Sequence, residues 1–435
     1  MTLDEKLFAL PPHQTAGCKT QPDWLFATRG LALMIATQGV TIKQVIQKNK
    51  HLSASIGARW NFNYCPNSPI SLIKCKERDM QYVACLRVGQ NDIKALINLE
   101  PERRDVFTPL LDMRGDDDRH LQTFLANWTD HPFFLDVSRV RKDVGENFIG
   151  GNDLHNASDA FENKQQFFLN TQQTNNHIIP VISWTDDDPQ RDVIQLALSA
   201  ERNFNQIAIR VFCPEKPTSA SWARLLSILD SLNLPNFAHV ILDFGATSPA
   251  STAAGSEFNH SLKQLDAYNL QSVVLLSTSF PIDKPASNTS RSSACYDVAW
   301  QSNIDRNGIN PSPTYGDYAA TNPTAPMEYI PGMPVLPFGC YYTPTEWWQR
   351  RKGGNKEFAN YIEIAQEVRN LPGYHGDDFC WATREYSRIV ATSTGYGNNG
   401  TWNGYRINQH ICAMILSITD DANEEFDELD FDDLV

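Results

Sequence analysis

The sequence predicts an α/β protein built around a (β/α)8 barrel of the TIM-barrel type, preceded by a small helical region and followed by an α+β cap. Two observations predict the barrel. From residue 80 onward, short apolar segments alternate with amphipathic segments, which is typical of a parallel sheet covered by helices. Seven such units are followed by an eighth strand-like segment at 313–318, and a count of eight favours a closed barrel over an open doubly wound sheet.

The barrel elements follow one another with short connections. Asp186, Asp187 and Asp188 place acidic residues where the fourth helix begins, as the helix dipole favours. No Gly-x-Gly-x-x-Gly follows a strand and no P-loop appears, which argues against a Rossmann-type nucleotide site. The predicted strands cover residues 82–88, 107–113, 133–137, 178–184, 207–212, 240–244, 272–277 and 313–318. The predicted helices cover 92–99, 119–128, 164–174, 189–202, 220–232 and 257–268, before an irregular polar insertion at 281–312.

Residues 1–79 differ from the rest of the chain in charge. They carry ten Lys/Arg and five Asp/Glu, whereas the whole chain has a net charge of −14. Residues 23–50 are predicted to form two helices separated at Gly39, followed by a strand-like segment at 69–74, which is the outline of a winged helix-turn-helix. A basic region of this kind suits nucleic acid, and a helical lid on the main domain is the alternative interpretation.

The segment after the barrel, 321–419, is predicted to form a cap that completes the barrel domain. Its expected elements are one strand and three helices, at 338–342, 356–369, 384–391 and 406–418. The last residues, 420–435, contain nine acidic residues and no basic one. That composition predicts a disordered tail, which either docks on a protein partner or only keeps the chain in solution.

The composition favours a folded cytoplasmic protein. A hydrophobic content of 41% supplies a sizeable core, and no apolar run approaches the ~20 residues that span a bilayer. The first residues lack the basic and apolar segments of a signal peptide. The nine cysteines form no Cys-x-x-Cys pair, a pattern typical of reduced thiols. We therefore expect a cytoplasmic location and no membrane contact.

The carboxyl ends of the predicted strands carry the polar residues from which a site would be built. In a parallel barrel these ends meet at one rim, where functional groups gather. Carboxylates and arginines on one rim need partners, because an unpaired charge in a protein interior is costly. The strand ends supply Arg87, Asp112, Asp136, Ser183 with Asp186, Arg210, Asp243, Ser277 with Thr278, and Asp317.

Two arrangements would satisfy these charges. In the first, a Mg²⁺ or Mn²⁺ ion is held by Asp136, Asp243 and Asp317 for metal-dependent hydrolysis of a phosphoester. Arg87 and Arg210 would then bind the phosphate. Two of the carboxylates would also suffice as the acid and base of a glycosidase. In the second arrangement the acids and arginines neutralise one another in internal salt bridges, and the sequence leaves both arrangements open.

A run of aromatic and charged residues extends from residue 315 to residue 410. His410 is the histidine best placed to act as a general base, and a packed histidine is the alternative. Trp348 and the basic residues up to Lys352 offer stacking faces beside positive charge, which suits a nucleotide or single-stranded nucleic acid. An amphipathic element with inward aromatics is the alternative. The candidate ligand-binding residues of this run are Tyr318, Tyr342, Trp348, Lys352, Trp381 and Trp402.

The order of several short motifs resembles a known family. The motifs are Gly316-Asp317-Tyr318, Tyr341-Tyr342-Thr343 with Trp348 and Lys352-Gly353, Phe379-Cys380-Trp381, and Trp402 before Gln409-His410. On these residues, and on the strand-helix units before them, the chain resembles the bacterial and phage "beta protein" family over about residues 82–417. The resemblance implies a barrel protein and brings no established activity. Because members occur in phage-related and mobile settings, it also implies a role in antiviral defence as an expectation.

These observations lead to one functional hypothesis and one alternative. The hypothesis is a barrel that binds a phosphate-bearing small molecule or nucleic acid, with hydrolysis as a further step. Its catalytic groups would be Asp136, Asp243, Asp317 and His410. The alternative is a non-catalytic module that recognises a protein or a nucleic acid through the basic region 1–79 and the acidic tail.

Overall fold

The computed structural model describes residues 81–137, 147–212, 219–323 and 334–432. Contacts divide the chain into two compact units, Met1–Cys75 and Lys76–Val435, and the described residues belong to the second. The predicted basic helical region at 1–79 therefore lies outside the described residues. Within the described ranges, no helix is both long and apolar enough to cross a membrane.

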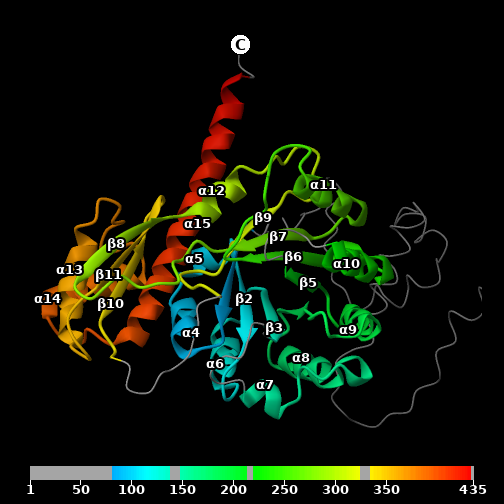
Figure 1. The fold of residues 1–435 in the computed structure, drawn as a ribbon, viewed down its shortest axis with the longest axis horizontal. Coiled ribbons are helices and arrows are strands. Elements are labelled where there is room, and N and C mark those ends of the chain that lie inside the picture. Colours follow the sequence, from blue (N-terminus) through cyan, green and yellow to red (C-terminus); the bar gives the residue numbers. More distant parts are fainter. Residues whose placement is uncertain (1–80, 138–146, 213–218, 324–333, 433–435) are drawn as a thin grey trace, which may run out of the picture. The chain divides into compact units, whose positions relative to one another are not determined.

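Eight parallel strands form a closed barrel, which confirms the predicted fold class (Figure 1). The predicted eighth strand is present, and it closes the ring by pairing with both the seventh strand and the first. The strands are β1 (Tyr82–Arg87), β2 (Phe107–Met113), β3 (Phe133–Val137), β4 (Ile178–Ile182), β5 (Ile207–Phe212), β6 (Ala238–Gly245), β7 (Ser272–Ser277) and β9 (Thr314–Asp317).

Side chains alternate across the barrel wall, because a strand points successive residues to opposite faces. One set fills the interior, and the residues between them pack outward against helices. At Gly316 an added Cβ would lie 2.8 Å from both the Leu275 carbonyl oxygen and a Val274 methyl group, so β9 can approach β7 this closely only with glycine there. The apolar interior residues include Val83, Leu110, Phe134, Val181, Ile241 and Val274.

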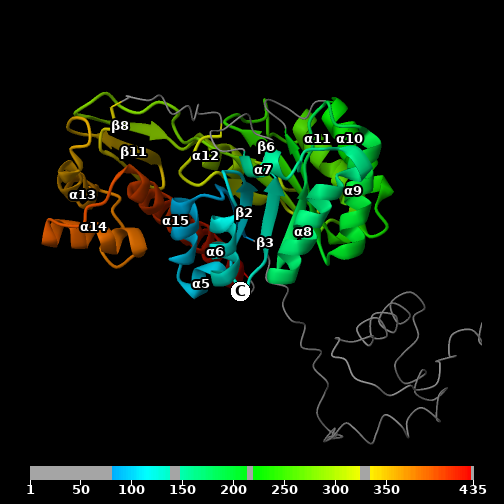
Figure 2. The same ribbon diagram turned by 90° about the horizontal axis from the view of Figure 1, so that it is seen from below.

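Helices cover the outside of the barrel, and α8 to α11 lie on the side away from the second sheet (Figure 2). In α9 the buried residues Val193, Leu196, Ala197 and Ala200 form the apolar stripe that the sequence predicts. The helices up to the seventh barrel strand are α4 (Gln90–Ile97), α5 (Pro101–Arg104), α6 (Arg119–Asn127), α7 (Asn147–Gly151), α8 (Glu162–Thr174), α9 (Gln190–Asn203), α10 (Ser219–Ser231) and α11 (Glu257–Gln264). Short 3-10 turns occur at Ser158–Ala160, Pro235–Phe237, Leu265–Tyr268 and Phe358–Asn360.

Three antiparallel strands form a second sheet in the order β10-β11-β8. They are β8 (Thr289–Ala294), β10 (Phe338–Tyr342) and β11 (Glu346–Arg351), and α12 (Tyr296–Ser302) follows β8. The segment predicted to be an irregular insertion thus contains a strand and a helix. The β8 sequence TSRSSA is polar and largely exposed, so hydrophobic alternation does not reveal it. We refer to β8, β10, β11 and the three helices after them as the cap.

The long last helix joins the cap to the barrel. The cap helices are α13 (Tyr361–Arg369), α14 (Trp381–Thr392) and α15 (Asn399–Asp432). The last of these packs against α4, β1 and β10. Its Gln409 side chain donates to the Tyr342 carbonyl and accepts from the Tyr342 N–H, both at 2.9 Å. The helix continues to Asp432, so most of the tail predicted to be disordered is helical here, since extending an existing helix needs no new nucleus (Figure 1).

Candidate functional site

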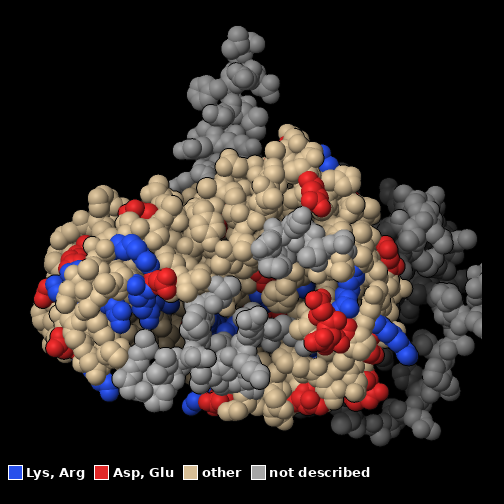
Figure 3. Space-filling view, viewed as in Figure 1, with Lys and Arg blue, Asp and Glu red and all other residues tan. Residues whose placement is uncertain are grey.

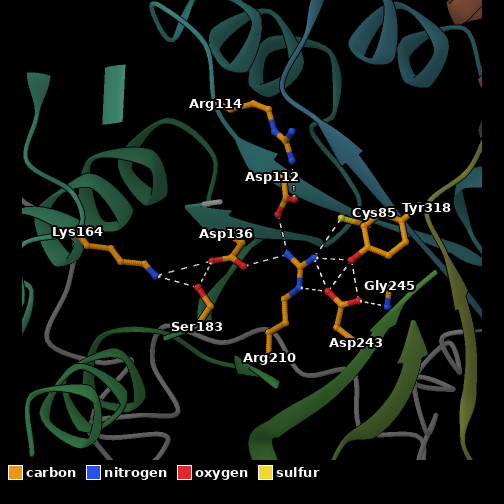
Figure 4. Close-up of polar contacts among 10 residues, drawn as sticks. All are labelled: Cys85, Asp112, Arg114, Asp136, Lys164, Ser183, Arg210, Asp243, Gly245 and Tyr318. Carbon is orange, nitrogen blue, oxygen red and sulfur yellow. Dashed lines mark hydrogen bonds and ion pairs between the residues drawn. The ribbon is translucent and has the colours of Figure 1, made fainter. Parts of the chain in front are cut away.

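The interior of the barrel holds a buried ion network centred on Arg210 of β5 (Figure 4). The Arg210 side chain is fully buried. Its Nη1 donates to Asp112 at 2.6 Å and to Asp136 at 3.0 Å. Its Nη2 donates to Asp243 at 2.7 Å. The Tyr318 hydroxyl donates to Asp243 at 2.6 Å and accepts from Arg210 Nη2 at 3.1 Å, so this predicted ligand-binding residue belongs to the network.

Two further cations complete the network. Lys164 Nζ lies 3.7 Å from Asp136 Oδ1, and Arg114 Nη2 donates to Asp112 Oδ2 at 3.1 Å. The network thus contains three carboxylates and three cations, and the cations are Arg210, Lys164 and Arg114. Burial alone would raise the pKa of Asp112, but the charges of Arg210 and Arg114 hold that pKa below its ordinary value. Of the two arrangements open from the sequence, internal neutralisation is the one formed inside the barrel.

Asp317 lies on the outer face of the barrel, away from this network. The next residue, Tyr318, points inward to Asp243, and neighbouring residues on an extended chain point to opposite faces. The Asp317 carboxylate accepts from Tyr82 Oη at 2.8 Å and lies 2.7 Å from Nε2 of His410. Both carboxylate and imidazole are about 1% exposed, so they form a buried contact between barrel and cap.

The predicted catalytic group is therefore divided between two places. Asp136 and Asp243 bind Arg210 inside the barrel, whereas Asp317 and His410 lie on the other side of its wall. A metal set of Asp136, Asp243 and Asp317 is not assembled. In the part of the chain that the structure describes, no group of three or more His, Cys, Asp or Glu residues is positioned to hold a metal ion.

Most of the other residues predicted to bind a ligand belong to the core or to surface ion pairs. Trp348 is buried in β11, and Lys352 pairs with Glu363 and Glu367 of α13. Three more pack on aromatic neighbours, with ring centroids 4.4 Å apart for Trp402 and Tyr361, 4.9 Å for Trp381 and Tyr405, and 4.5 Å for Tyr342 and His410. The aromatic run thus supplies packing contacts within the cap.

A cavity of about 470 Å³ opens at the carboxyl ends of β1 and β2. We call it the rim cavity. Its walls come from the turn between β1 and α4, from the segment after β7, and from β10, β11 and α15 of the cap. Figure 3 shows Lys and Arg side chains gathered over the second sheet, and further basic side chains inside the central hollow. Arg87 is the one predicted site residue in the lining.

The charge in the lining of the rim cavity is mainly positive. Arg87, Arg114, Lys284 and Arg406 line it, against Asp92 as the acidic residue. Burial lowers the pKa of Arg406, and partial burial lowers the pKa of Lys284, which the charge of Arg406 lowers further. Burial also raises the pKa of Asp92, although Arg87 and Arg114 oppose this. Burial thus disfavours the charged forms of Arg406 and Lys284, and the charge of Arg406 adds to this at Lys284, so a bound anion would favour the charged forms of both.

Helix α4 begins at the edge of the rim cavity. Its N-cap is Gly89, which has no side chain to satisfy the first N–H groups, and the first helical hydrogen bond runs from Ile93 N to Gly89 O at 3.0 Å. Gly89, Gln90 and Asn91 all line the cavity. The first N–H groups of a helix lack partners within the helix, and together with the helix dipole they attract anions.

A second cavity, of about 600 Å³, lies at the amino ends of the strands. Its charged groups have partners: His131 Nε2 lies 3.0 Å from Asp105 Oδ1, and Arg104 donates to the carbonyl oxygens of Ile97, Leu99 and Asn127. His239 lies buried against it, and burial lowers the His239 pKa to about 3, so the ring is neutral. Because parallel barrels place their chemistry at the carboxyl ends, the rim cavity is the candidate site.

Comparison with protein families gives a decisive match. The sequence model described as "Beta protein" matches residues 82–415, from the first barrel strand into α15. The chain belongs to the Beta protein family. This membership confirms the resemblance seen in the sequence, and both the Arg210 network and the rim cavity lie within the matched region. A comparison with curated proteins finds no match.

In this member of the Beta protein family, sequence reasoning found Arg87 but missed most of the rim cavity. Its lining residues Lys284, Gln349 and Arg406 come from a loop, a strand and a helix that are far apart in the sequence. One local signal was available: Gly89 lies two residues after the end of the first barrel strand and caps the start of a helix, which is a common setting for anion binding. No local sequence pattern indicates that the cap contributes cations to the rim cavity.

Proposed function

We propose that this protein binds a phosphate-bearing ligand in the rim cavity. The observation that carries the proposal is a group of basic residues without carboxylate partners. Within the described ranges, the lining residues Lys284 and Arg406 form no ion pair, and the charges of Arg406 and of the nearby Arg351 lower the pKa of Lys284. A buried cation without an ion pair is costly, and a bound anion would offset that cost.

The phosphate would lie at the start of α4, where Arg87 and Arg406 approach the cavity from the barrel and from the cap. Backbone N–H groups there would supply short donors, and the guanidinium groups would supply charge and paired donors. Asp92 is compatible with this arrangement, because burial raises the pKa of its carboxyl and so makes protonation beside an anion less costly than for an exposed aspartate. The proposal concerns binding. Recognition of a nucleic acid or a protein through residues 1–79 and the acidic tail stays a separate prediction.

Isothermal titration of the full chain with inorganic phosphate and pyrophosphate tests the proposal. We expect binding that weakens with added salt, and a loss of about 10- to 100-fold in affinity for Arg406→Gln, since a hydrogen bond to a charged group contributes roughly 1.5–3 kcal/mol. Arg119→Gln is the matched control, because its side chain is 72% exposed on α6, outside the cavity lining. Equal weakening in both variants, or no binding at low salt, would contradict the proposal.

A further inference from the structure

We infer that the ligand of the rim cavity is a phosphate ester of a hydroxyl-rich, sugar-like group, and that its organic part is recognised without stacking a nucleobase. The inference rests on the proposed function, and it specifies the substrate class of the same cavity. Three features carry it: the amide side chains of the lining, aromatic rings that cations already contact, and the size of the space.

Amide side chains supply the polar wall of the cavity. Gln349 of β11 is fully buried and lines it; its Oε1 accepts from Arg291 at 2.7 Å, while its Nε2 has no hydrogen-bond partner within the described ranges. Asn91 of α4 and Asn403 of α15 line the opposite wall and are half-buried. Amides donate and accept hydrogen bonds, as hydroxyl groups do. A ligand with several hydroxyl groups would therefore match this wall.

The carboxyl group of Asp92 is another polar group that could bind a hydroxyl group of the ligand. Its Oδ1 is buried and lacks a hydrogen-bond partner among the described residues. Asp92 stands one turn into α4, beside the helix start where the phosphate would bind. A carboxyl group accepts from a ligand hydroxyl when ionised and also donates when protonated. Together with Asn91 and Asn403, it would hold hydroxyl groups adjacent to a phosphate.

The aromatic rings of the cavity are not available for stacking. Phe280 and Phe338 are its aromatic lining residues, and Arg406 lies over both rings, with Cζ 4.9 Å and 5.8 Å from their centroids. Lys284 Nζ also lies over the Phe338 ring at 5.4 Å. A nucleobase gains affinity mainly by covering such a face. Here it would have to displace cations that the phosphate itself needs.

The space fits a phosphate with one small organic group. A volume of about 470 Å³ lies within the range of small-molecule sites, roughly 300–1,000 Å³. The amides and Asp92 lie around the basic group, so one ligand would reach both.

Titration of the full chain with four compounds tests the inference: inorganic phosphate, ribose, ribose 5-phosphate, and adenosine monophosphate, which is the same ester carrying a base. We expect ribose 5-phosphate to bind at least about 10-fold more tightly than phosphate, and adenosine monophosphate to bind no more tightly than ribose 5-phosphate. Asn403→Leu should weaken ribose 5-phosphate by about 3- to 10-fold, the value of a neutral hydrogen bond, and leave phosphate unchanged. Asn127→Leu, at the exposed end of α6, is the control.

The outcomes separate the two proposals. If neither phosphate nor ribose 5-phosphate binds, the proposed function fails and this inference falls with it. If phosphate binds and ribose adds no affinity to it, the function stands and the sugar-like class is wrong. If adenosine monophosphate binds at least 10-fold more tightly than ribose 5-phosphate, the site recognises a nucleobase, which overturns the inference.

Discussion

Replacing Arg210 by methionine tests whether the barrel interior is held by its ion network. Methionine is similar in length and carries no charge, so the substitution removes the cation with little change in volume. It leaves Asp112, Asp136 and Asp243 without their shared partner inside the barrel. Each of these carboxylates is at most 2% exposed, so water does not replace the lost contacts.

The expected loss is large because the remaining charges stay buried. Removing one partner of a buried ion pair destabilises a protein by about 3–5 kcal/mol, since the other charge is left uncompensated. Arg210 serves three carboxylates, and Lys164 and Arg114 retain contacts with two of them, Asp136 and Asp112. We therefore expect Arg210→Met to lower the free energy of unfolding by about 3–5 kcal/mol at pH 7.

Urea denaturation followed by tryptophan fluorescence measures this loss. Arg119→Met is the matched control: it removes an arginine that is 72% exposed, and its effect should stay within about 0.5 kcal/mol. A loss below about 1 kcal/mol for Arg210→Met would refute the assigned role of the network.

The pH dependence supplies an independent check. In the wild type the pKa of Asp112 is lower in the folded protein than in the unfolded chain, where it is about 3.9. The free energy that Asp112 contributes to folding is therefore fully present above about pH 3.9 and is lost as the pH falls through the folded-state pKa. Without Arg210, the burial that raises the pKa of Asp112 is opposed by Arg114 alone. The variant then regains stability as protonation neutralises these groups. The gap between variant and wild type should narrow as the pH falls from 7 to about 4.5, and a constant gap would refute the reasoning.

Three further predictions follow from other contacts. Trp402→Ala should lower the free energy of unfolding by about 3–5 kcal/mol in urea denaturation, because Trp402 is 1% exposed and stacks on Tyr361 and Tyr386. Lys352→Ala should cost less than about 1 kcal/mol in the same assay, since its pair with the exposed Glu363 is screened by solvent. In titrations across pH, phosphate affinity should fall as the pH rises through the lowered pKa of Lys284, because only protonated lysine attracts the anion. The decline should be shallower in Lys284→Arg, whose guanidinium stays charged.

The barrel could be predicted from the sequence because its strands are apolar on both faces. Segments such as 107–113 and 240–244 are mostly apolar and lie between turn residues, and they appear as β2 and β6. The strand β8 could not be predicted in this way. Its polar residues are specified by pairing with β11, as where Arg291 faces Gln349, and such long-range pairing leaves no periodic trace in the sequence.

The candidate site was harder to predict because a strand changes the direction of its side chains at every residue. A shift of one position separates Asp317, which points out to His410, from Tyr318, which points in to Asp243. The strand-end rule therefore gathered Asp112, Asp136, Asp243 and Arg210 correctly in space but could not tell a neutralised network from a functional rim.

The packing of the cap against the barrel also determines which basic residues meet at the rim cavity. Much of the aromatic run that stands out in the sequence is buried, and it packs within the cap, whose helix α15 lies against β10, α4 and β1. That packing brings Arg406 beside Arg87, so cations from two parts of the chain repel each other across one cavity. The apolar contacts of the cap supply the free energy that keeps the two arginines together. An anion bound between Arg406 and Arg87 would convert that repulsion into attraction, and would stabilise the junction of cap and barrel by mass action.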